Sequence, residues 1–291
     1  MEDFQLKQLN GAFNGKLNEL FNEWIASYPE DRRAKDMFVK DGLLLKYKDA
    51  VSGYDINSKW EDAERRIMFI VKDCPDGWGY DARCLLIGSS EDEAVEKNAE
   101  KTRSLKSRFF KNIACMLYGL SILTEENKGK EDIFNDVKHD VGRLRKVFND
   151  MPFAYIEGKK LAGGRTCSAK KLAEAMEESK DFLSRELDIL NPNIIVCCDS
   201  DGVIFDNLVR NYFKGAVPDD EHKWEYQHQN DAQIICKLYY YADRGILLFN
   251  SYHPSARGAD WRIYERVISP FRQFFYKYKT FDVVSVMNKI N

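Results

Sequence analysis

The side chain best suited to chemistry is a histidine near the end of the chain. His253 directly follows an apolar stretch at 245–250, precedes Pro254, and has Ser255 and Arg257 close behind it. A histidine at the end of a strand, beside a hydroxyl and a guanidinium, can donate hydrogen bonds to a developing negative charge. The alternative is structural: a histidine that caps the strand or satisfies a backbone carbonyl.

A second group of candidates follows the apolar run at 67–71. Asp73 and Asp76 come directly after this run, so one of the two carboxylates can act as a general base or stabilise positive charge. Trp78 and Tyr80 add flat rings that suit stacking on a nucleobase. The alternative makes Asp73 a turn or helix-cap residue and Trp78 part of the core, because aspartate is common in turns.

Basic residues and glycines gather after a third apolar stretch, at 153–156. The segment 157–164 is interpreted as a loop that contains Lys159 and Lys160 and leads to Arg165. Such a loop can hold a phosphate or a nucleic-acid backbone. Its glycines do not have the spacing of a P-loop, so the sequence gives no nucleotide-binding signature here.

Composition limits the class of protein. The chain has 291 residues, of which 44% are hydrophobic and 13% aromatic, and its formal net charge is −3. This is enough apolar material for a core, and the charge is not that of a protein that coats nucleic acid. The sequence shows no secretory signal and no apolar run near the ~20 residues of a membrane helix. It therefore predicts a globular cytoplasmic protein with reduced thiols and no membrane partner.

The sequence lacks the familiar signatures of metal and cofactor chemistry. It has no G-x-S-x-G elbow, no H-E-x-x-H helix and no C-x-x-C pair, and its four histidines are not spaced as metal ligands. We therefore expect no metal ion and no cofactor.

Apolar periodicity predicts an α/β fold with a mostly parallel sheet and helices on both faces. The expected strands cover 67–71, 153–156, 194–198, 234–241 and 245–250, and the expected helices include 10–28, 105–120, 168–190 and 259–277. The acidic stretch at 199–231 is interpreted as solvated helix faces.

Residues 1–60 are expected to form an N-terminal helical extension, and residues 61–291 a single α/β domain. Ligands of such sheets bind outside the carboxyl ends of the strands. This rule selects three loops, at 72–80, 157–164 and 252–258.

Two of these loops resemble the active-site motifs of the uracil-DNA glycosylase superfamily. The first is K-D-C-P-D-G-W-G-Y at 72–80, and the second is S-Y-H-P-S-A-R at 251–257, with N-P-N-I-I-V at 191–196 between them. The resemblance covers 66–277. It implies a three-layer α/β/α fold around a central, mostly parallel four-stranded sheet. It also implies hydrolysis of the N-glycosidic bond of uracil or another modified base in DNA, as in base-excision repair.

The resemblance also assigns catalytic roles. His253 would stabilise the base as it leaves as an anion, and Asp73, at the second position of the first motif, would be the catalytic carboxylate. Cys74 takes the third position, where some branches of the family have a carboxylate or an amide, and this places it beside the base. Lys72 stands where the family has glycine.

Contacts to the base and to the DNA follow from the same resemblance. Trp78 or Tyr80 would stack on the flipped base, and Ser255 and Arg257 would contact the phosphate backbone together with the basic loop. The family reads uracil with an asparagine at the end of an intervening strand, where this chain has Glu157. A carboxylate only accepts hydrogen bonds, so it cannot reproduce the paired donor and acceptor of an amide.

Two other functions stay open. The first is a non-catalytic nucleobase- or nucleic-acid-binding protein on the same fold, because Lys72, Cys74 and Glu157 replace family residues. The second is hydrolysis of a small nucleoside or phosphorylated ligand at the same strand ends. The expected partner is DNA, with single-stranded and damaged DNA included. No iron–sulfur cluster is expected, because the cysteine cluster of the family's iron–sulfur members is missing.

Overall fold

A computed structural model gives the fold of the chain. It describes residues 7–31, 38–46, 55–75, 81–87, 93–124, 126–127, 139–163, 166–218, 220–227 and 233–278. Residues 73–75, 93–95, 220–227 and 233–236 are described by their backbone alone.

Four parallel strands form the middle of a larger sheet. Their order across the sheet is β3-β2-β4-β7, and each pairs in parallel with its neighbour. The strands are β2 (Ile67–Pro75), β3 (Ala154–Gly163), β4 (Ile194–Cys198) and β7 (Ile246–Ser251). Apart from the ends of β2, β3 and β7, these strands are continuous apolar runs, as expected for strands buried on both faces.

Antiparallel strands extend the sheet at both edges. β1 (Gly42–Leu43) pairs with β3, while β6 (Gln233–Tyr241) pairs with β7 and β5 (Asp220–Gln227) pairs with β6. The α/β class is therefore confirmed, but the sheet is mixed and has seven strands within the described residues. β5 lies in the acidic stretch at 199–231, interpreted above from its composition as solvated helix faces. That interpretation is wrong for residues 220–227, which form a strand because they pair with β6.

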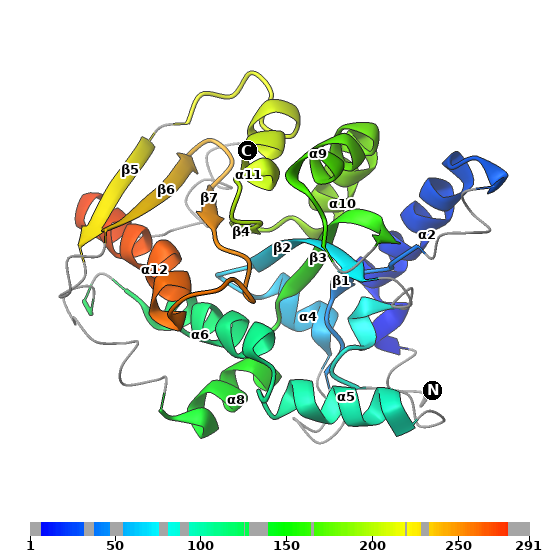
Figure 1. The fold of residues 1–291 in the computed structure, drawn as a ribbon, viewed down its shortest axis with the longest axis horizontal. Coiled ribbons are helices and arrows are strands. Elements are labelled where there is room, and N and C mark those ends of the chain that lie inside the picture. The colour runs from blue at the N-terminus through cyan, green and yellow to red at the C-terminus, as the bar shows by residue number, and fades with distance from the viewer. Residues whose placement is uncertain are drawn as a thin grey trace.

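Helices cover both faces of the sheet (Figure 1). The face that carries α6 (Arg108–Ile122), α8 (Val141–Asp150) and α12 (Asp260–Lys277) is called the α6 face. The α11 face carries α2 (Ala12–Ser27), α4 (Ile56–Glu61), α9 (Ala169–Glu178), α10 (Lys180–Leu190) and α11 (Val203–Asn211). A 3-10 turn, η1 (Ala82–Cys84), and α5 (Glu93–Arg103) lie between β2 and α6 in the chain. Within the described residues, no helix has both the length and the apolar character needed to cross a membrane.

The chain leaves two neighbouring strands in opposite directions. After β2 it continues to α6 and α8 on the α6 face, whereas after β4 it continues to α11 on the α11 face. In open α/β sheets, ligands bind in the crevice where such connections diverge. The carboxyl ends of β2 and β4 form this switch point.

The first 60 residues contribute more than a helix, because they also supply an edge strand. Gly42 of β1 pairs with Tyr155 of β3, and its φ of +136° belongs to a region that favours glycine. A Cβ at this position would lie 2.5 Å from Leu17 Cδ1 of α2 and 2.9 Å from Asn14 Oδ1. The missing side chain thus lets α2 pack closely against the edge of the sheet.

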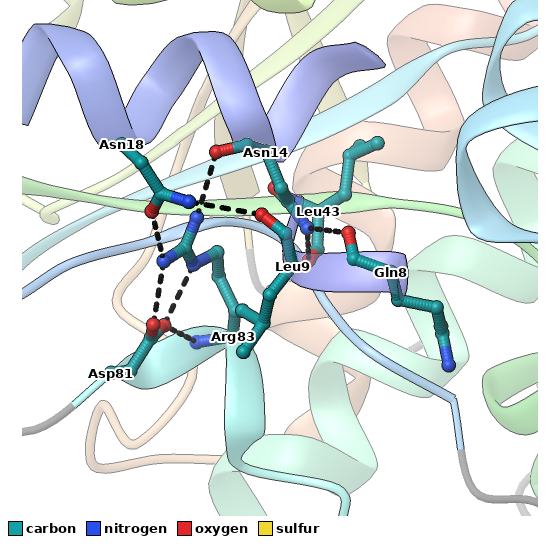
Figure 2. Close-up of polar contacts among 7 residues, drawn as sticks. All are labelled: Gln8, Leu9, Asn14, Asn18, Leu43, Asp81 and Arg83. Carbon is teal, nitrogen blue, oxygen red and sulfur yellow. Dashed lines mark hydrogen bonds and ion pairs between the residues drawn. The ribbon is translucent and has the colours of Figure 1, made fainter. Parts of the chain in front are cut away.

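A buried arginine ties α2 to the segment that follows β2 (Figure 2). Arg83 donates from Nε to Asp81 Oδ1 at 2.7 Å and from Nη2 to Asp81 Oδ2 at 2.6 Å. The same guanidinium donates to Asn14 O at 3.1 Å and to Asn18 Oδ1 at 2.7 Å, both in α2. All three guanidinium nitrogens therefore have partners, and this is the condition for burying the charge at tolerable cost.

We expect Arg83→Ala to lower the free energy of unfolding by about 3 kcal/mol, because it leaves the Asp81 carboxylate without its charged partner and the α2 acceptors without the guanidinium donor. Urea titration followed by circular dichroism measures the change. The control is Arg143→Ala, whose partner Asp140 is exposed at the surface and whose cost should stay within about 1 kcal/mol. Equal changes in the two variants would show that the Arg83 contacts add nothing specific.

Candidate functional site

Polar side chains from three strand ends meet at the switch point. Lys72 of β2 places Nζ 3.1 Å from Oδ2 of Asp201, which follows β4. The backbone N–H of His253, which follows β7, donates to Ser200 Oγ at 2.9 Å. We call Lys72, Asp199, Ser200, Asp201 and His253 the strand-end cluster. It joins one predicted site residue, His253, to the end of β2, as expected for parallel strands.

The imidazole of His253 is held in one orientation. Nδ1 accepts a hydrogen bond from the Ser255 backbone N–H at 3.2 Å, and the ring lies 5.4 Å from the ring of Phe109 in α6. A neutral imidazole that accepts at Nδ1 carries its proton at Nε2. Burial and, after it, the positive charge of Lys72 lower the pKa of His253 from 6.5 to about 4. The ring is therefore a neutral N–H donor at pH 7.

The loop that carries His253 is fixed to α6. The buried side chain of Asn112 donates to Pro254 O at 2.8 Å. Arg108 donates to Gly258 O at 2.5 Å and pairs with Asp260 at 2.8 Å. These bonds hold both ends of the loop, while Ser255 and Arg257 between them are exposed. Their contact with a nucleic-acid backbone stays a prediction.

Asp199 organises the loop that follows β4. Its carboxylate accepts from the backbone N–H groups of Gly202 at 3.2 Å, Val203 at 2.5 Å and Ile204 at 3.2 Å, at the start of α11. Burial raises the pKa of this carboxyl group, while the three N–H donors and the charge of Lys72 act in the opposite direction. Asp199 thus caps α11 and places a buried carboxylate beside the lysine.

Glu157 lies on the same face of the sheet as His253. It is 1% exposed, and its Oε1 accepts from the Tyr155 hydroxyl at 2.7 Å. The Phe109 ring lies 6.2 Å from the Tyr155 ring and 5.4 Å from the His253 ring. Phe109 therefore packs against both His253 and the tyrosine that binds Glu157.

Lys160 is not available to DNA, so its predicted role is wrong. Its Nζ is fully buried and lies 2.6 Å from Asp41 Oδ2 and 2.9 Å from Glu186 Oε2. Lys159 is half-buried and donates to Leu161 O. The cause is that 157–163 belongs to β3 and is not a loop. Successive side chains of a strand point to opposite faces, so one lysine of the pair enters the core.

The first predicted loop also begins later than expected. β2 runs through Pro75, and Asp73 pairs with Lys159 in the ladder between β2 and β3. The side chains of Asp73 and Cys74 lie outside the described part of the chain, as do Trp78, Tyr80 and Arg165. Their proposed roles therefore stay predictions.

Sequence reasoning missed four residues of this region: Phe109, Asp199, Ser200 and Asp201. The last three had a usable signal, because D-S-D-G directly follows a predicted strand and falls under the same strand-end rule as the three selected loops. Phe109 had no such signal, since it belongs to an ordinary apolar helical stripe. Its role arises only from the packing of α6 against the sheet.

Within the described residues, no group of three or more histidine, cysteine, aspartate or glutamate side chains could hold a metal ion. Compared with protein-family models and with curated proteins, the chain matches none.

The state of His253 can be tested directly. We expect its imidazole to titrate with a midpoint of about 4 in the folded protein, because burial and Lys72 disfavour the charged form. In urea the same ring should titrate near 6.5. The unfolded chain then binds more protons than the folded one between these values, so His253 makes stability fall as the pH drops through this window. Proton NMR measures both midpoints, and a folded-state midpoint at or above 6.5 would contradict the assigned neutral donor.

Proposed function

We propose that the chain is a DNA glycosylase-like enzyme that hydrolyses the N-glycosidic bond of uracil or another modified base. The observation that carries the proposal is the imidazole of His253, a neutral Nε2–H donor fixed at the carboxyl ends of parallel strands. The four parallel strands between two helical faces fit the three-layer arrangement that the resemblance implies. Lys72 and Asp201 form an ion pair at the neighbouring strand ends, with Nζ 3.1 Å from Oδ2.

The chemistry requires a donor on one side of the bond and a carboxylate on the other. The C1′–N bond breaks, its electron pair goes to the base, and positive charge develops on the sugar. His253 donates from Nε2 to an oxygen of the leaving base, which lowers the energy of the anion. Asp73 accepts a proton from the water that adds to C1′. The products are a free base and an abasic sugar.

The residue that reads the base is Glu157 in this proposal. Its carboxylate accepts hydrogen bonds and donates none, so it favours a base edge that presents N–H groups. The Tyr155 hydroxyl fixes one carboxylate oxygen at 2.7 Å. An amide presents both a donor and an acceptor to the base, whereas Glu157 presents acceptors alone. The substrate in this proposal can therefore be a modified base as well as uracil.

We expect Asp73→Asn to lower the rate of base release about 10²–10⁴-fold, because the variant loses its proton acceptor. His253→Ala should lower the rate about 10²–10³-fold. The assay measures abasic sites in oligonucleotides that contain uracil, hypoxanthine, xanthine or a thymine mismatch. The control, His139→Ala, removes an exposed histidine outside the strand-end cluster and should keep the full rate. Full activity in both site variants would contradict the assigned roles.

A second function is a nucleobase- or nucleic-acid-binding protein without catalysis. Lys72 and Glu157 favour it, because both place charge where the family has neutral groups. Binding that weakens steeply with salt, together with no base release from any of the four substrates, would support this second function over the first.

A further inference from the structure

A buried group of three charged side chains joins the N-terminal segment to the sheet and to α10. Asp41 lies directly before β1, Lys160 belongs to β3 and Glu186 to α10, and all three side chains are fully buried. Lys160 Nζ donates to Asp41 Oδ1 at 2.7 Å, to Asp41 Oδ2 at 2.6 Å and to Glu186 Oε1 at 3.0 Å. These bonds use the three hydrogens of the ammonium group. We call Asp41, Lys160 and Glu186 the buried triad.

The surroundings of the buried triad supply no balancing charge. Two aromatic rings of α2 face Lys160 Nζ, Phe21 at 5.7 Å and Trp24 at 5.5 Å. The charged residues of α2 and α9, and those of α10 other than Glu186, are exposed. The largest electrostatic influences on Lys160 and on Glu186 come from the other two members of the triad. Charged groups of nearby segments have partners of their own: Lys159 donates to Leu161 O, Glu157 accepts from Tyr155, and Arg83 pairs with Asp81.

The triad contains two acidic groups for a single basic one. If both carboxyl groups were ionised, the net charge would be −1, and such a charge is costly to bury. The carboxyl group of Glu186 is in hydrogen-bond contact with that of Asp41, and a bond between them requires a proton on one of the two.

The hydrogen bonds of Asp41 decide which group carries this proton. Asp41 accepts from Lys160 and, at 2.6 Å, from the backbone N–H of Glu157, and these bonds stabilise its ionised form. Within the described residues, Glu186 Oε2 accepts no hydrogen bond. The proton therefore belongs to Glu186, and burial together with the charge of Asp41 raises the pKa of this glutamate.

We propose that the buried triad is a pH-sensitive connection between the N-terminal segment and β3, which stays closed while Glu186 holds its proton and opens when that proton is lost. In the closed state Asp41 binds both Lys160 and the Glu157 backbone N–H. After loss of the proton, two carboxylates repel each other around one ammonium group. Asp41 is the member that moves, because it lies outside the strand and the helix that hold the other two. The Glu157 N–H then loses its acceptor.

The pH range over which the connection opens follows from proton linkage. Once the triad is opened to water, Glu186 has the ordinary pKa of a glutamate, about 4.3, whereas the closed triad keeps the proton to higher pH. Between these two values the closed state binds one proton more than the opened state. The closed state therefore becomes less stable as the pH rises through this window. The direction is opposite to the effect of His253, which makes stability fall as the pH drops.

The first experiment removes the titrating proton but keeps the hydrogen bonds. In Glu186→Gln the amide oxygen accepts from Lys160 and the amide N–H donates to Asp41, so the triad stays neutral. The urea midpoint of unfolding is measured between about pH 5 and pH 9. The midpoint of Glu186→Gln, relative to that of the wild type, should rise with pH.

The control for this experiment is Glu177→Gln. Glu177 is a glutamate of α9 at the surface, where it pairs with Lys180 at 2.7 Å. Its variant should keep a constant difference in midpoint from the wild type over the same pH range. A constant difference in Glu186→Gln as well would overturn the proposal.

The second experiment follows the Glu157 amide in the wild-type protein. Hydrogen exchange of this N–H, measured by NMR and corrected for base catalysis, reports opening of its bond to Asp41. Its protection should fall by up to about tenfold per pH unit, because each opening releases one proton. The Val196 amide, in the middle of β4, should keep its protection.

Neither experiment involves DNA or base release, so their outcome is independent of the proposed function. The exchange measurement also decides the matter if Glu186→Gln fails to fold. Protection of the Glu157 amide that does not change with pH in the wild type would overturn the proposal.

Discussion

The parallel pairing of β2 with β4 and of β4 with β7 is the constraint on which the site depends. Ile70 lies opposite Cys197, and Cys198 opposite Ser251, so the three strands end at one edge of the sheet. Lys72 and His253 are far apart in the sequence, yet both extend from this edge. The connections after β2 and β4 turn to opposite faces, and in open α/β sheets ligands bind where such connections diverge.

A buried group of charged side chains joins the N-terminal segment to β3. Asp41 accepts from the Glu157 backbone N–H at 2.6 Å and from Lys160 at 2.6 Å. Lys160 also bonds to Glu186 of α10, and burial together with the nearby Asp41 raises the pKa of Glu186 well above its usual range. Two acidic groups around one ammonium group are tolerable only when each is hydrogen-bonded. Asp41, which precedes β2, thus fixes the backbone at Glu157. The sequence alone assigned residues 1–60 to an N-terminal helical extension and gave no such contact.

What the sequence could predict depended on whether an element was apolar along its whole length. The strand at 194–198 has the predicted bounds, and the final helix, at 260–277, differs by one residue. β2 and β3 were predicted too short, because both end in charged residues that look like loops. Burial of Lys160 depends on Asp41 and Glu186, which lie 119 and 26 residues away. Local patterns cannot reveal such partners. The position of His253 at a strand end was predictable. The lowering of its pKa was not, because it depends on burial of the ring and, after it, on the charge of Lys72.

The charged residues that replace family residues lie on opposite faces of the sheet. Glu157 lies on the α6 face with Tyr155, whose hydroxyl it binds, and Phe109 packs there against both Tyr155 and His253. Lys72 alternates with Met68 and Ile70 toward the α11 face and pairs with Asp201 beyond the end of β4. In the proposed site, a base that turns its N–H groups toward Glu157 would therefore lie on the same side of the sheet as the neutral imidazole, so recognition and bond cleavage would share one face of the strand ends.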